Sequence, residues 1–231
     1  MIDDCRPQEL TVWAHEVRED SPEHARLAEI LHVSAARHDH LCPRQVLGAR
    51  MGLAGLAVIG LPAPIQHKNA LVFIESDGCF ADGIEAATGA TVGHRTLRVQ
   101  DLGKVAAVFG NLTTQQAMRL VPHPEVRERA KRYAQEVKTN YHAQLQGYRL
   151  MPDQELFCFQ EVELDPALEA VVSRAGVRAR CERCGEEIIN GRQVLSAGKC
   201  LCRTCAGQGY YVPKDGLEER SLDPFRPDRT D

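Results

Sequence analysis

The sequence lacks the features that mark membrane-spanning, secreted and nucleic-acid-binding chains. Its longest apolar run, residues 51–61, is well short of the roughly 20 residues that cross a bilayer. No basic stretch followed by an apolar one opens the chain, as a secretory signal would. A strong positive charge is also absent, because 28 Lys and Arg against 32 Asp and Glu leave a net charge of -4. We therefore expect a cytoplasmic protein without membrane contact, whose main task is not to hold nucleic acid.

The composition is that of a soluble globular protein. With 231 residues, of which 43% are hydrophobic and 26% charged, the chain can build one substantial core and a small appendage. The nine cysteines stand out. Their paired spacing favours metal binding in a reducing compartment over a disulfide framework.

Local patterns predict an α+β core. Ser21 followed by Pro22 suits the start of a first helix, and Pro43 suits the first turn of a second. Gly89 suits the end of a third helix. Short apolar runs bounded by turn residues predict strands. We expect helices over residues 22–36, 43–59, 79–88 and 124–144, and strands over residues 70–75, 96–99, 104–109, 117–121 and 156–164.

Three glycines lie inside the second predicted helix. Gly48, Gly52 and Gly55 each cost about 1 kcal/mol of helix propensity relative to alanine. Small residues let another backbone approach the helix closely. That segment could belong to the same core or to the second chain of a dimer, and we favour the same core.

Four cysteines near the C-terminus form the strongest motif. Cys181-x-x-Cys184 and Cys202-x-x-Cys205 are separated by seventeen residues, a spacing typical of a four-thiolate zinc site. Cys200 is an alternative to Cys202, but only Cys202 completes a second Cys-x-x-Cys pair. A closed site of this kind is structural, and its folding and metal binding should be one event.

This motif also predicts the domain organisation. We expect a core over residues 1–164, a connector over 165–180, a treble-clef-like zinc finger over 181–211 and a disordered tail over 212–231. Arg178, Arg180 and Arg183 cluster at the start of the finger. From residue 178 onward, however, ten Lys and Arg oppose nine Asp and Glu, a poor electrostatic footprint for phosphates.

A second group of metal-binding and nucleophilic residues lies upstream, and we call it the core cluster: His38, His40, Cys42, Cys79 and Asp82. The first three alternate along the chain, so in extended backbone their side chains share one side. Histidine and thiolate both suit zinc, nickel or iron. Cys42 and Cys79 stand at the starts of predicted helices, whose macrodipoles should lower the thiol pKa.

The core cluster has two functional interpretations and one structural one. His38, His40, Cys42 and Cys79 could hold a second transition metal, or Cys79 and Asp82 could be the catalytic residues of a thiol active site. In the structural alternative the two cysteines are small buried side chains and the histidines cap the first helix.

Four motifs follow one another along the chain: HDHLCP at residues 38–43, CFADGIE at 79–85, TGATVG at 88–93 and D-x-GK-x-A at 101–106. In this order they resemble the family of the E subunit of formylmethanofuran dehydrogenase, over roughly residues 20–210. The resemblance implies an α+β core, often dimeric, followed by a treble-clef zinc finger. It also implies that the His/Cys/Asp residues form a shared pocket able to hold a metal.

The family takes its name from a molybdenum or tungsten enzyme of one-carbon metabolism that handles formyl groups on methanofuran. The resemblance therefore implies a homodimer, with subunits of such an oxidoreductase as partners, and a chain that is itself a subunit or relative of that enzyme. The alternative is a non-catalytic zinc-finger adaptor or regulator that docks proteins or, less favoured, binds nucleic acid.

Overall fold

The computed structural model describes residues 18–38, 40–66, 68–134, 136–165, 167–172 and 175–211. The chain divides into two compact units between Val171 and Val172. The tail for which disorder is expected, residues 212–231, lies outside the described residues.

The first unit is built on a five-stranded sheet with the strand order β2-β1-β3-β4-β5. Its strands are β1 (Ala70–Ile74), β2 (Leu97–Val99), β3 (Ala107–Asn111), β4 (Ala117–Pro122) and β5 (Phe157–Glu161). β1 and β2 run parallel, and the other neighbouring strands are antiparallel. The register places Val72 opposite Phe109 and Phe109 opposite Met118, and all three side chains are buried in the core.

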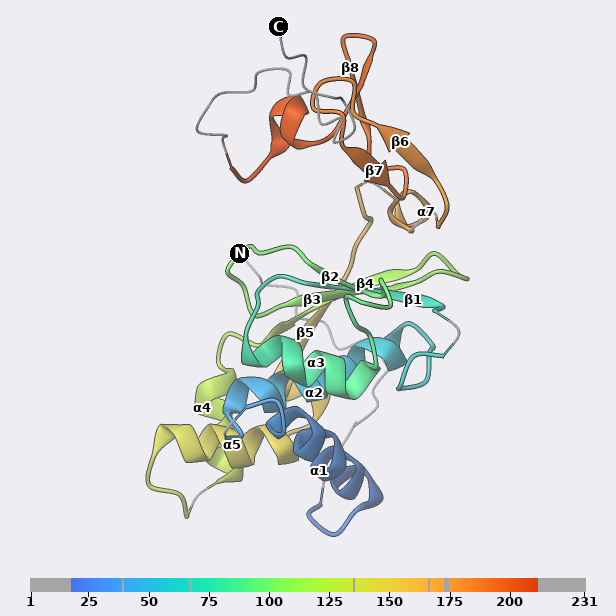
Figure 1. Ribbon diagram of the computed structural model, residues 1–231. Coiled ribbons are helices and arrows are strands. Elements are labelled where there is room, and N and C mark those ends of the chain that lie inside the picture. Colours follow the sequence, from blue (N-terminus) through green and yellow to red (C-terminus); the bar gives the residue numbers. More distant parts are fainter. Residues whose placement is uncertain are drawn as a thin grey trace, which may run out of the picture. The chain divides into compact units, whose positions relative to one another are not determined.

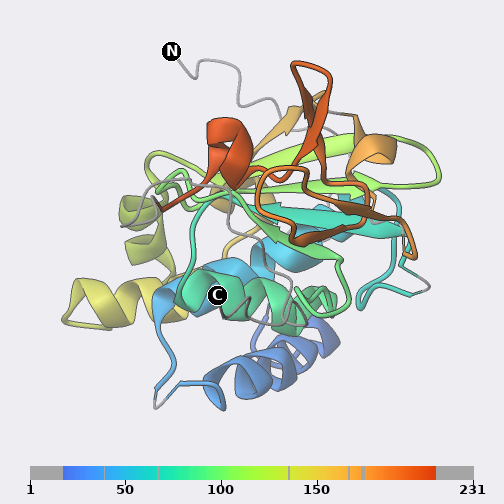
Figure 2. The same ribbon diagram turned by 45° about the horizontal axis from the view of Figure 1, so that its top comes forward.

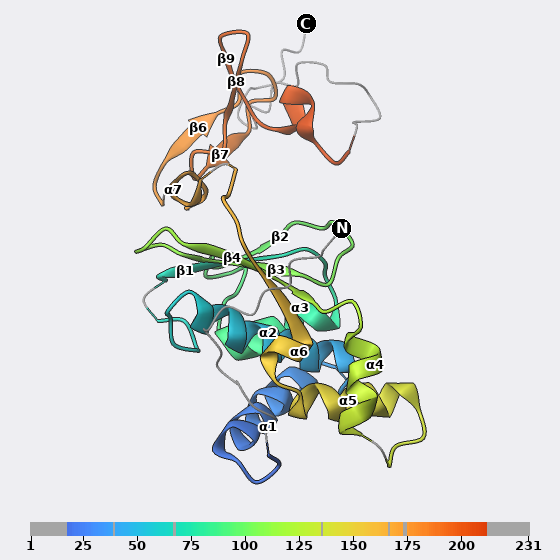
Figure 3. The ribbon, with the colours of Figure 1, turned by 180° about the vertical axis from the view of Figure 1, so that it is seen from behind.

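The helices lie in layers against one face of this sheet (Figures 1 and 3). Nearest to the sheet are α2 (Pro43–Val58) and α3 (Cys79–Thr88), and α1 (Pro22–Ala35) lies beyond them. The expected helix signals are confirmed, because the Ser21 side chain accepts a hydrogen bond from the His24 amide. Gly89 adopts the left-handed conformation that ends α3. The mixed helix and sheet content confirms the α+β fold class.

The glycines of α2 allow close packing inside the core. A Cβ atom on Gly48 would lie 2.2 Å from the Phe80 carbonyl oxygen of α3. On Gly55 it would lie 2.3 Å from the ring of Phe109 in β3. The approach is mutual, because a Cβ atom on Gly83 of α3 would lie 2.2 Å from the Gln45 carbonyl oxygen of α2. Contacts within one chain therefore account for these glycines.

The long helix expected over residues 124–144 is wrong. The chain instead forms α4 (Val126–Ala130), the 3-10 turn η1 (Lys131–Tyr133) and α5 (Asn140–Leu150), followed by α6 (Asp153–Leu156) before β5. Ala134 has the non-helical angles φ -147 and ψ 51. Thr139 then starts a new helix as N-cap, and its side chain accepts from the His142 amide. The break lets α5 return against α4, where a Cβ atom on Gly147 would lie 2.5 Å from the Ala130 carbonyl oxygen.

A buried arginine joins α2 to the segment that contains α5 and α6. Arg50 is 0% exposed and donates to the carbonyl oxygens of Tyr148 and Met151. It also donates to the Asp153 carboxylate at 2.9 Å. Burial lowers the pKa of Arg50 to about 10, although the charge of Asp153 opposes this. The guanidinium thus remains protonated and fixes the end of α5 on α2.

The second unit consists of two short hairpins and a helical segment. β6 (Arg178–Arg180) pairs with β7 (Glu187–Ile189), and β8 (Val194–Ser196) pairs with β9 (Lys199–Leu201). The helical segment η2 (Thr204–Gln208) follows, and Figure 2 shows it beside the hairpins of the same unit. The first of these strands, β6, lies within the range expected for the connector. A further short helix, α7 (Leu168–Val171), ends the first unit.

Two observations bear on the expected cellular location. None of the helices in the described part of the chain is long and apolar enough to cross a membrane. Cys158 in β5 is disulfide-bonded. The expectation of a reducing cytoplasm therefore stays a prediction.

Candidate metal centres

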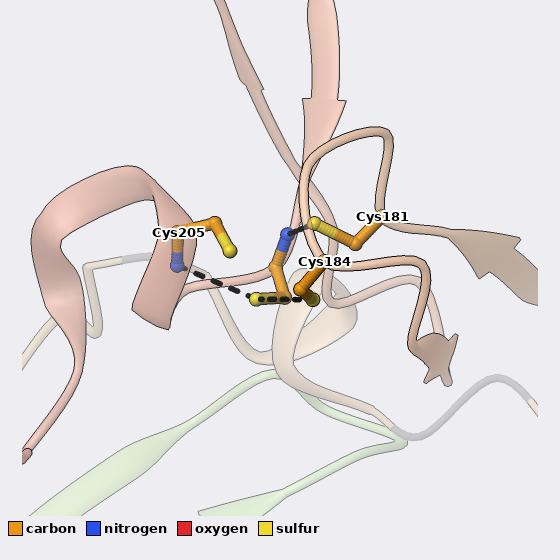
Figure 4. A group of neighbouring side chains, drawn as sticks. Cys181, Cys184 and Cys205 are labelled. Atoms are coloured by element: carbon orange, nitrogen blue, oxygen red, sulfur yellow. Dashed lines mark hydrogen bonds between the residues drawn. The ribbon is translucent and has the colours of Figure 1, made fainter. Parts of the chain in front are cut away.

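The four finger cysteines converge. Their sulfur atoms all lie within 4.8 Å of one another (Figure 4). Cys181 and Cys184 come from the turn between β6 and β7, and Cys202 and Cys205 from the end of β9 and the start of η2. Cys200, in β9, is outside this group. The structure thus chooses Cys202 over Cys200 as the partner of Cys205.

The electrostatics of this group suit a soft divalent cation. Burial raises the pKa of the Cys205 thiol, and the neighbouring thiols raise it further. Burial also raises the pKa of Cys181, but backbone N–H groups, first that of Cys184, outweigh this and lower it to about 6. Four crowded sulfurs cannot all become thiolates without a compensating positive charge. The donor set therefore fits a four-thiolate metal, and a metal-binding site is present in the second unit.

The finger has little else to hold it together. Its buried apolar cluster contains two of the cysteines, Cys181 and Cys205, together with Ile188 and Leu201. So small a core contributes little folding free energy without a cross-link. The metal is therefore the main organiser expected for this unit.

In the core cluster, the structure brings His38 and Asp82 into direct contact. His38 follows the end of α1, and its Nε2 atom shares a hydrogen bond with the Asp82 carboxylate of α3. The preceding residue, Arg37, donates to the Glu85 carboxylate one turn further along α3. Two consecutive residues of the α1–α2 loop are thus bonded to two acidic residues on one face of α3.

Cys42 and Cys79 lie beside this contact. Cys42 is the N-cap of α2 and is buried, whereas Cys79 begins α3 and is half-buried. The expectation of an acidified thiol at Cys79 is wrong. Burial raises its pKa, as does its contact with the Cys42 thiol, and both oppose the macrodipole. The two thiols are neighbours, and both are free.

His40 is the core-cluster residue that the structure does not bring to the others. Its side chain is exposed. Among the described residues, the finger thiols are also the only set in which three or more such donor atoms lie within 4.8 Å of one another. The core cluster is therefore two linked pairs, His38 with Asp82 and Cys42 with Cys79, and its metal binding stays a prediction.

Sequence reasoning missed three residues at this junction: Arg37, Glu85 and Gln45. Glu85 could have been found, because it lies three residues after Asp82 and so on the same face of a helix. Gln45 also has a local signal, since Cys42-x-x-Gln45 follows the capping-box pattern with cysteine in the place of serine. Nothing in the sequence near Arg37 indicates which acidic side chain it meets.

An α+β core with a two-pair His/Cys/Asp junction and a separate four-cysteine finger defines the class of protein. A family model described as "FmdE, Molybdenum formylmethanofuran dehydrogenase operon" matches residues 37–158, more than half of the chain. The chain belongs to this family. The match contains all five residues of the core cluster and ends before the finger.

Two relatives show how far the likeness extends. A "Probable S-adenosyl-L-methionine-binding protein" of Archaeoglobus fulgidus is 26% identical over 221 residues, covering 86% of this chain and 58% of the relative. The chain thus spans little more than half of that protein. A crystal structure of an FmdE-like protein of tungsten formylmethanofuran dehydrogenase, from Syntrophus aciditrophicus, aligns with a TM-score of 0.49 and 17% identity, covering 86% of this chain and 99% of that chain.

Proposed function

We propose that this protein serves a molybdenum- or tungsten-dependent oxidoreductase that handles formyl groups, as an accessory metal-binding subunit. The finger would hold a structural zinc, and the core cluster a second transition metal. The observation that carries the proposal is the junction of the α1–α2 loop with α3, where His38 meets Asp82 and Cys42 neighbours Cys79. Membership of the FmdE family supports the choice of enzyme system.

The residues of the junction suit a metal that keeps an open position. The Cys42 and Cys79 sulfurs and the His38 imidazole are ligands that zinc, nickel and iron accept. Because Asp82 engages Nε2 of His38, the ring would offer Nδ1, and the carboxylate would orient it. Exposed His40 is the fourth candidate ligand. A bound cation would favour the Cys79 thiolate, whose formation burial opposes.

Metal stoichiometry tests the core site. The purified full chain should contain two metal equivalents, and Cys42→Ala and Cys79→Ala should each contain one, as measured by elemental analysis. Cys200→Ala is the matched control, since it removes a free thiol outside both groups and should keep two equivalents. A wild type with a single equivalent, or variants that keep both, would show that the core cluster holds no metal.

Association tests the rest of the proposal. Light scattering should give twice the 25.6 kDa of one chain if the protein is a homodimer. Tagged protein should co-purify in fixed stoichiometry with a molybdenum- or tungsten-containing enzyme, and the bound molybdenum or tungsten can be quantified. A chain that elutes as a monomer would contradict the dimer, and a preparation without either metal would contradict the enzyme partner.

Surface properties of the finger support one alternative, a non-catalytic adaptor. Leu195 is 78% exposed and Tyr210 is 98% exposed, so the finger presents apolar and aromatic side chains suited to docking. Its arginines are less available for phosphates, because Arg178 binds Glu187 and Arg180 donates to the Gly185 carbonyl. An adaptor would lose its partner on Cys202→Ser and keep it on Cys42→Ala, whereas an accessory subunit with a working core should need Cys42.

A further inference from the structure

The loop that joins α1 to α2 carries three of the five core-cluster residues. One side chain, Gln45, links the two ends of this loop. Gln45 is 0% exposed, and its Oε1 atom accepts from the Cys42 amide at 2.7 Å. Its Nε2 atom donates to the carbonyl oxygen of Ser34 at 3.1 Å and to the Ser34 hydroxyl at 3.2 Å. Because Ser34 lies in the last turn of α1, the amide connects the end of one helix to the N-cap of the next.

A second contact holds the loop from outside. The Tyr141 hydroxyl of α5 donates to the Leu41 carbonyl oxygen at 2.9 Å. Leu41 lies between His40 and Cys42, so this bond fixes the backbone immediately before the Cys42 thiol. The two residues are 100 positions apart in the sequence. On the remaining side, Arg37 and His38 are bonded to the acidic face of α3.

We infer that Gln45 and Tyr141 are positioning residues of the core metal site. Neither offers a ligand to the metal. Each holds the α1–α2 loop so that His38 and Cys42 face Asp82 and Cys79 before any ion arrives. A free loop would have to be ordered on binding, at a cost in backbone entropy for every residue that becomes fixed. Loss of such supporting contacts typically weakens metal binding by about 10- to 100-fold. The inference rests on the proposed function of the core cluster.

Tyr141→Phe is the sharpest test, because it removes a single hydroxyl from a side chain that is 43% exposed. Its matched control is Tyr133→Phe, which removes a hydroxyl that donates to Glu155, away from the loop. Gln45→Met keeps the length of the side chain and removes its three hydrogen bonds. In the full chain the finger is first saturated with zinc, which Co²⁺ displaces poorly from a four-thiolate site. Cobalt is then titrated and followed by its thiolate charge-transfer absorption.

We expect Tyr141→Phe to raise the cobalt dissociation constant about tenfold, Gln45→Met to raise it further, and Tyr133→Phe to leave it unchanged. The melting temperature of Tyr141→Phe should match that of its control. If the wild type binds cobalt in the core and Tyr141→Phe binds it equally well with the same spectrum, the positioning role is wrong and the metal site stands. A wild type without a thiolate–cobalt band overturns the metal site itself, and the inference with it. If Gln45→Met does not fold, Tyr141→Phe still decides.

Discussion

At the scale of single residues, the packing of α2 on α3 depends on the absence of side chains. Gly48 and Gly83 bring each helix within contact of the other's carbonyl oxygens. The same approach brings the start of α2, with Cys42 and Gln45, next to the start of α3, with Cys79. Glycine lowers the helix propensity of both segments, and the contact it permits offsets that cost.

Gly48→Ala should therefore destabilise the first unit. The new methyl group would lie 2.2 Å from the Phe80 carbonyl oxygen, a backbone atom that cannot move without shifting α3. We expect a loss of about 1–3 kcal/mol in the free energy of unfolding, as is typical of overpacked cores. Urea denaturation monitored by circular dichroism measures it.

Gly93→Ala is the control for this prediction, because a Cβ atom on Gly93 meets nothing within 4 Å. Its effect should stay within about 0.5 kcal/mol. Equal stability of the two variants would mean that α2 and α3 do not pack as closely as described.

At the scale of elements, an ion pair spans the sheet. Glu75 follows β1 and is buried, and its carboxylate accepts two hydrogen bonds from Arg119 of β4, at 2.6 and 2.8 Å. β3 lies between these two strands. The Arg119 hydrogen bond lowers the pKa of Glu75 below its ordinary value of 4.5, although burial opposes this. The pair therefore joins two strands that are not hydrogen-bonded neighbours.

This pair should make stability depend on pH in the acidic range. Because the carboxyl pKa is lower in the folded than in the unfolded state, the stabilisation is fully present above pH 4.5 and is lost as the pH falls through the folded pKa. At pH 7, Glu75→Gln should cost about 1.5–3 kcal/mol. It should also lose less stability than the wild type between pH 7 and pH 3, as measured by urea denaturation at each pH.

Glu161→Gln serves as the control for charge, because Glu161 is exposed at the end of β5. This variant should follow the pH dependence of the wild type. A Glu75→Gln profile parallel to the wild type would show that the pair does not contribute to stability at neutral pH.

At the scale of the whole molecule, the two units depend on different forces. The first has a large apolar core around Phe109, Leu56 and Ile84, whereas the second has a small cluster built largely on its cysteines. Metal removal should therefore act on the second unit alone.

Cys202→Ser should release the finger metal and unfold residues of the second unit, leaving the cooperative unfolding of the first unit unchanged. Metal content and limited proteolysis, read by mass spectrometry, measure the two effects. Cys200→Ser is the matched control and should keep both the metal and the protected finger, since Cys200 lies outside the thiol group. Retention of the metal by Cys202→Ser, or its loss from Cys200→Ser, would contradict the ligand assignment.

The sequence by itself determined what depends on neighbours along the chain. Helix starts at Pro22, Pro43 and Cys79 follow from caps and proline, and the four finger ligands follow from their spacing. The core-cluster residues were also visible, because two short motifs contain them all.

Only the tertiary structure decided what depends on contacts between distant segments. The break after Tyr133 exchanges continuous helical hydrogen bonding for packing of α5 on α4, which no local propensity reveals. The bond from Tyr141 to Leu41 and the choice of Asp82 as the partner of His38 depend in the same way on how the helices meet. The raised pKa of Cys79 belongs here too, because burial and the Cys42 thiol, both consequences of folding, outweigh the helix dipole that the sequence indicates.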